Sequence, residues 1–92
     1  MLKFEWSIDK NEYLKETRDI CFEDVKRAIL EDKVLDIIPH FNKKYPHQEV
    51  LIIILHNYVH YVPFVQDDEK IFFKTIVPSR KLNKLYNKKD TQ

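Results

Sequence analysis

The chain has 92 residues, 43% of them hydrophobic, and a formal net charge of +1, which is typical of one folded domain spanning 1–92 with surface grooves rather than large enclosed cavities. No apolar run approaches the length of a membrane span, and charged residues interrupt the first six positions, so neither a membrane helix nor a signal peptide is predicted. A single cysteine cannot form a disulfide within the chain, which favours a cytoplasmic location.

The N-terminal third predicts two helices after a short extended segment. Residues 4–6 alternate as a short strand would. Ser7 is a good N-cap for a helix that continues to about Arg18. Apolar residues at helical spacing then predict a second helix from about Phe22 to Glu31.

The middle of the chain predicts a sheet. The expected strands are 34–38, 49–55, 58–65 and 70–77, joined by a polar loop at 39–47 and by turns at 56–59 and 66–69. The strand 49–55 is apolar at odd and even positions alike, so both of its faces should be covered. The predicted fold is therefore α+β, with two N-terminal helices packed on a four-stranded antiparallel sheet and a short basic helix at the C-terminus.

The last predicted strand continues directly into that basic helix. Pro78 and Ser79 mark the join, because proline cannot donate to a strand ladder and serine is a good N-cap. Arg80 then falls in the first helical turn. Residues 71–92 hold six Lys/Arg and one acid, a charge of +5, against −4 for residues 1–70. We predict that this C-terminal end contacts a polyanion. Alternatively, its lysines only form the solvent-exposed face of a helix.

Strand pairing decides which side chains share a face. A two-residue hairpin would place Ile54 opposite Tyr61 and His56 opposite Val59, and a turn that pairs Val65 with Lys70 would place Tyr61 opposite Lys74. One face then collects the core residues Leu51, Ile53, Leu55, Tyr58, His60, Val62, Phe64, Ile71, Phe73, Thr75 and Val77.

The opposite face is mixed: it is apolar in the middle, and His56, Tyr61 and Lys74 lie on it with Arg80 at its end. A cation, an aromatic ring and an imidazole are what a phosphodiester-binding groove needs. Alternatively, a partner protein or the last helix covers this face, and a register slip of one residue would exchange the two faces.

The four histidines do not predict a metal site. None has helical i, i+4 spacing or a cysteine partner, and the register above puts His56 and His60 on opposite faces. No metal and no cofactor are expected. His60 is interpreted as a core-edge residue, whereas His47 and His56 are better placed for exposed chemistry.

Three local strings resemble the BrnT family, toxins of type II toxin–antitoxin modules with a RelE-like fold. The residues at 4–11, Phe-Glu-Trp-Ser-Ile-Asp-Lys-Asn, are similar to an aromatic-x-Trp-Asp pattern followed by lysine and asparagine. Residues 20–25 are similar to the family's Val-Ser-Phe-Glu-Glu-Ala, and residues 76–81, with Tyr86 following, to its Ile-Ser-Ala-Arg-Lys run before a basic helix. Asp19 stands where the family has a helix-ending glycine.

The resemblance implies a metal-independent endoribonuclease that cleaves mRNA and is neutralised by a small DNA-binding antitoxin, through which alone it would contact operator DNA. The family's arginine position assigns Arg80 to the phosphate and its late tyrosine assigns Tyr86 to RNA contact. The mixed face adds Lys74 beside Arg80, with His56 or Tyr61 for proton transfer. Further RNA contacts are expected from Lys81, Lys84 and His47.

A second hypothesis is a non-catalytic binding module that acts with its partner antitoxin as a DNA-binding repressor. The low net charge and the apolar centre of the mixed face favour it. Both hypotheses allow a homo-oligomer or a hetero-oligomer, and neither predicts a membrane contact.

Overall fold

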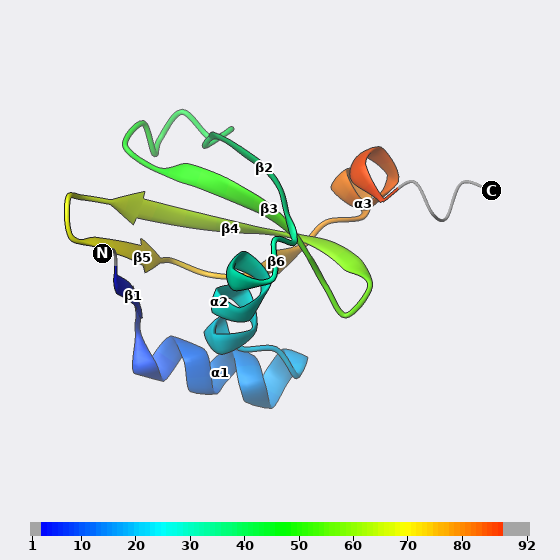
Figure 1. Ribbon diagram of the computed structural model, residues 1–92, viewed down its shortest axis with the longest axis horizontal. Coiled ribbons are helices and arrows are strands. Elements are labelled where there is room, and N and C mark those ends of the chain that lie inside the picture. Colours follow the sequence, from blue (N-terminus) through cyan, green and yellow to red (C-terminus); the bar gives the residue numbers. More distant parts are fainter. Residues whose placement is uncertain (1–2, 88–92) are drawn as a thin grey trace.

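The computed structural model describes residues 3–87, and its architecture is α+β as predicted (Figure 1). In chain order the elements are β1 (Lys3–Trp6), α1 (Ile8–Arg18), α2 (Phe22–Leu30), β2 (Val34–Pro39), β3 (Glu49–Leu55), β4 (Tyr58–Gln66), β5 (Lys70–Phe73), β6 (Val77–Pro78) and α3 (Arg80–Tyr86). None of the helices in this part of the chain is long and apolar enough to cross a membrane.

The sheet differs from the predicted four-stranded antiparallel one, because it is mixed and larger. Its strand order is β1-β5-β4-β3-β2, with the two-residue β6 also pairing with β4. The extra edge strand β1 runs parallel to β5, and Phe4 lies opposite Ile71. Aromatic packing holds β1 there, since the rings of Phe4 and Trp6 both stack on Phe73, with centroids 5.7 and 6.1 Å away.

The predicted register between β3 and β4 is wrong by two residues. Ile54 lies opposite Val59, and Tyr61 lies opposite Ile52. The turn consists of His56 and Asn57, whose φ angles are 54° and 63°. Two left-handed residues in succession make the hairpin turn that best matches strand twist, and in a chain without glycine asparagine accepts this conformation most readily. A shift of two residues leaves the faces of β3 and β4 unchanged.

The predicted strand 70–77 is interrupted, and this changes its faces. Val65 of β4 lies opposite Phe72 of β5, and not opposite Lys70 as predicted. Strand β5 then ends at Phe73. After the break at 74–76, β6 places Val77 opposite Tyr61, so the prediction that Lys74 lies there is also wrong. Within the break Ile76 turns into the core, where it is fully buried, instead of joining the mixed face.

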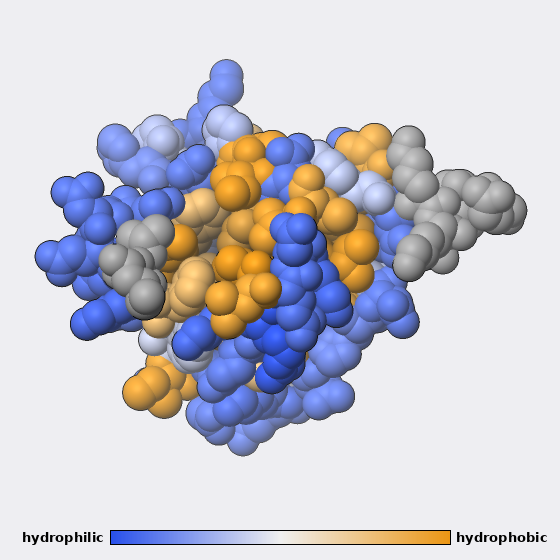
Figure 2. All heavy atoms as spheres, in the orientation of Figure 1, coloured by the Kyte–Doolittle hydropathy of each residue, from blue (hydrophilic) through white to orange (hydrophobic). Residues whose placement is uncertain are grey.

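Helices α1 and α2 cover one face of the sheet, as predicted. Ser7 caps α1, its side chain accepting a hydrogen bond from the Lys10 amide. The core between these helices and the sheet consists of Leu14, Ile20, Phe22, Val25, Ala28, Leu51, Ile53, Leu55, Val62, Phe64, Phe73 and Ile76. Figure 2 shows this side of the molecule, where hydrophobic atoms gather in the middle and polar atoms cover the region of α1.

Helix α3 covers part of the opposite face. A second cluster there is built on Val50, Ile52 and Val59, with Ile38, Ile54, Tyr61, Leu82 and Tyr86 packed against it. The helix is capped by the Ser79 hydroxyl, which accepts from the Leu82 amide at 3.1 Å. The Tyr86 hydroxyl donates to Asp36 of β2 at 3.0 Å. The last helix therefore covers part of this face, which is one of the alternatives that the sequence left open.

Candidate functional site

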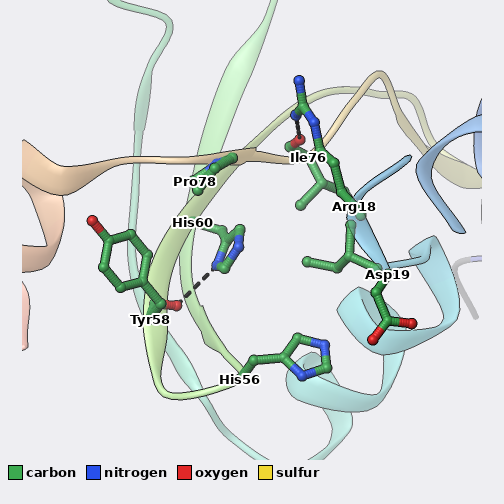
Figure 3. A pocket seen from close by; sticks show the side chains of 8 residues that line it. Arg18, Asp19, His56, Tyr58, His60, Ile76 and Pro78 are labelled. Carbon is green, nitrogen blue, oxygen red and sulfur yellow. Dashed lines mark hydrogen bonds between the residues drawn. The ribbon is translucent and has the colours of Figure 1, made fainter. Parts of the chain in front are cut away.

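A pocket of about 440 Å³ opens where the end of α1, the β3–β4 turn and β6 meet (Figure 3). Arg18, Asp19, Ile20, His56, Tyr58, His60, Ile76 and Pro78 line it. These residues come from three separate segments of the chain, so only the folded domain brings them together. In the described part of the chain, this pocket has the densest grouping of imidazole and guanidinium groups beside a hollow.

His60 lies on the inner wall of the pocket. It is 8% exposed, and its Nδ1 atom is 2.9 Å from the carbonyl oxygen of Tyr58. A carbonyl can only accept, so in this contact Nδ1 carries the proton and Nε2 keeps its lone pair. Burial lowers the pKa of His60, the Tyr58 carbonyl opposes that effect, and the nearby His56 and Arg18 lower the pKa further. The lowered pKa therefore keeps the His60 ring neutral at pH 7.

His56 lies at the mouth of the pocket, in the β3–β4 turn. Its side chain is 61% exposed, and its Nε2 atom is 3.8 Å from Oδ2 of Asp24 in α2. When the ring is protonated, this contact is an ion pair. His56 is therefore open to solvent while the Asp24 carboxylate lies beside its ring.

Arg18 and Asp19 form the helical side of the pocket. The Arg18 Nη1 atom donates to the carbonyl oxygen of Ile76 at 3.1 Å, which uses one of the five donors of the guanidinium. Asp19 ends α1 in the left-handed conformation with a φ of 53°. Its amide hydrogen bonds back to the Leu14 carbonyl, so the chain reverses here and carries Ile20 into the pocket wall.

The pocket offers an anion one charged partner, the guanidinium of Arg18, beside two imidazole rings. The nearby carboxylates are those of Asp19, which is exposed, and Asp24, which is 3.8 Å from the His56 ring. A bound oxyanion would hydrogen bond to Arg18 and would reverse the unfavourable charge environment of His60. The pocket thus combines one guanidinium group with two imidazole rings, which are groups that can hydrogen bond to a phosphate.

The predicted catalytic residues do not form one group. His56 lies in the pocket on the side of α1 and α2, whereas Tyr61 lies on the α3 side and packs edge-on against Phe41, with ring centroids 5.1 Å apart. Lys74 is exposed in the break after β5, with its Nζ atom 5.3 Å from the centre of the Phe72 ring. The prediction that His56 shares a face with Tyr61, and not with His60, is therefore wrong, because His56 belongs to the turn.

The predicted RNA contacts surround α3 and one loop. Arg80, Lys81 and Lys84 are exposed, and His47 is exposed in the β2–β3 loop. Tyr86 is half-buried, and its hydrogen bond to Asp36 raises the pKa of its hydroxyl. Arg80 is two residues beyond Pro78, which lines the pocket, so the start of α3 and the pocket are joined by β6.

Sequence reasoning missed Arg18, Tyr58 and His60 as site residues. The available signal was the pair His56 and Asn57, which are the two residues of this chain's tightest hairpin turn. When both residues occupy the turn, the His56 side chain lies on the same side of the hairpin as the His60 side chain. Nothing in the sequence pattern brings Arg18 to that turn, because the approach of α1 is a long-range packing contact.

Among residues 3–87, no three His, Cys, Asp or Glu side chains are grouped as a metal site would require. Cys21 is partly buried, and desolvation raises the pKa of its thiol, which does not suit a nucleophile. Comparison of the chain with protein-family models, with curated proteins and with solved structures finds no match.

Proposed function

We propose that the chain is the toxin of a type II toxin–antitoxin module, an endoribonuclease that cleaves mRNA without a metal ion and is neutralised by a small DNA-binding antitoxin. The observation that carries the proposal is the cationic start of α3. Arg80, Lys81 and Lys84 are exposed, and no described carboxylate forms a salt bridge with any of them. A cluster of exposed positive charges attracts a polyanion such as RNA.

The aromatic surroundings of α3 support RNA rather than a compact anion. Tyr86, the last residue of the helix, and Tyr61 are half-buried, and Phe41 is 55% exposed against the Tyr61 ring. Stacking of unpaired bases on aromatic rings is the usual way in which proteins hold single-stranded RNA. Arg80 would bind a phosphate while these rings contact bases.

Expression of the chain without its antitoxin tests the proposal. We expect growth arrest in bacteria together with loss of intact mRNA, and we expect Arg80→Ala to relieve both, because Arg80 supplies the phosphate contact. The matched control is Arg27→Ala, an exposed arginine of α2 that pairs only with Asp24. Normal growth with abundant folded protein, or equal relief by both variants, would contradict the proposal.

A second candidate function is a non-catalytic module that represses transcription together with its antitoxin. The observation that favours it is the separation of His56 from Tyr61, which leaves the two alternative proton-transfer candidates on different sides of the sheet. This alternative predicts that the chain binds its antitoxin and strengthens operator binding while RNA remains intact at every enzyme concentration tested.

A further inference from the structure

We propose that the pocket between α1, the β3–β4 turn and β6 is the cleavage site, in which Arg18 binds the scissile phosphodiester, His60 is the general base and His56 is the general acid. This inference rests on the proposed endoribonuclease function and assigns its chemistry to residues outside the face around Tyr61. Arg80 then binds a neighbouring phosphate of the same RNA strand.

The geometry supports these roles. In Figure 3 the His60 ring points into the hollow and the His56 ring lies below it, while the Arg18 guanidinium lies at the upper edge, turned toward the Ile76 carbonyl to which it donates. His60 is held by its Nδ1 contact to the Tyr58 carbonyl, and its Nε2 atom has no hydrogen-bond partner among residues 3–87. A fixed ring with a vacant acceptor is what a general base requires, since its position sets the rate of proton transfer.

The charged groups near His60 differ from those near His56. His60 faces Arg18 and His56, which are cationic or become so, and its only acidic neighbour in the pocket is the exposed Asp19. His56 faces the Asp24 carboxylate of α2. The surroundings of the two rings therefore differ, because His60 is buried beside Arg18 whereas His56 is exposed beside a carboxylate.

The reaction balances with these groups alone. The ribose 2′-oxygen gives its proton to Nε2 of His60 and forms a bond to phosphorus. The bond from phosphorus to the 5′-oxygen breaks, and that oxygen takes a proton from the His56 ring. Arg18 stabilises the charge that develops on the non-bridging oxygens. The products are a 2′,3′-cyclic phosphate and a 5′-hydroxyl end.

Phosphate binding is tested by following the histidine ring signals of the intact chain by NMR during pH titrations with and without inorganic phosphate. We expect phosphate to raise the pKa of His60 by roughly one pH unit, as an opposite charge at contact distance does. Arg18→Gln should abolish this response and Arg18→Lys should retain part of it. His40, in the β2–β3 loop, is the internal reference. No response at His60, or an equal response at His40, overturns the inference.

Cleavage of a long transcript tests the catalytic roles. His56→Gln is the main variant because His56 is exposed and its replacement should not unfold the domain. We expect a loss of about 10²-fold or more in rate, cyclic phosphate ends in the wild-type products, and no loss with His40→Gln. His60→Gln should lose at least as much, and a thermal melt checks that it folds.

The two proposals fail in different ways. If Arg80→Ala relieves growth arrest but His56→Gln and His60→Gln cleave at the wild-type rate, the pocket is not the site and the proposed function stands. If the wild-type chain cleaves no RNA and does not arrest growth, both the catalytic roles and the proposed function are overturned, even where phosphate binds in the pocket.

Discussion

Asn11 links the two N-terminal helices through one buried amide. Its Oδ1 atom accepts from the Phe22 amide at 2.7 Å, and its Nδ2 atom donates to Glu23 at 2.8 Å. The second contact lowers the pKa of Glu23. A side chain from α1 thus satisfies the Phe22 amide at the start of α2, beside the capping box that Cys21 and Asp24 form there.

We therefore expect Asn11→Ala to lower the free energy of unfolding by about 1–3 kcal/mol, because it leaves a buried amide without a partner. Urea unfolding at pH 7 measures the change. Glu16→Ala, at an exposed position of the same helix, should change stability by less than about 0.5 kcal/mol. Equal effects of the two substitutions would show that the Asn11 contacts contribute nothing.

At the scale of elements, local patterns predicted most of the fold. Ser7 and Ser79 as caps, the two apolar helix faces and the doubly buried β3 all follow from residue type and spacing. The hairpin register did not, because it depends on which two residues take positive φ, and His56 is not a usual choice. The break after Phe73 was also missed, since it depends on contacts of Ile76 with distant elements.

The attachment of α3 can be tested by two leucines of the same helix. Leu82 packs against the cluster of Val50, Ile52 and Val59, whereas Leu85 is 59% exposed. We expect Leu82→Ala to lower the free energy of unfolding by roughly 1–2 kcal/mol and to speed amide hydrogen exchange throughout α3, because it removes buried apolar area. Leu85→Ala should leave both measurements nearly unchanged. Faster exchange with Leu85→Ala alone would place the helix differently.

At the scale of the molecule, two further features that sequence patterns did not predict are long-range contacts. β1 pairs in parallel with β5, about 67 residues later in the chain, and Arg18 reaches the carbonyl of Ile76. Such contacts carry no periodic signal in the sequence. They nevertheless decide the site, because the approach of α1 to the β3–β4 turn is what encloses His60.

The charge asymmetry of the whole molecule gives a final prediction, on the salt dependence of RNA binding. Removing one cation that touches a phosphate should reduce the slope of log affinity against log salt by about 0.7 for a single strand. Replacing Arg80, Lys81 and Lys84 by glutamine should therefore reduce the slope by about 2. Replacing Lys15, Lys26 and Lys33, which are exposed on α1, on α2 and just after α2, removes the same charge from another side.

Fluorescence anisotropy with a single-stranded RNA between 50 and 300 mM salt, roughly the range in which counterion release governs binding, would measure both slopes. If the two triple variants change the slope equally, RNA responds to net charge and has no preferred surface. If only the first variant does, the strand follows α3. Pro78 of β6 lines the pocket and Arg80 begins α3 two residues later, so the two surfaces are adjacent in the chain.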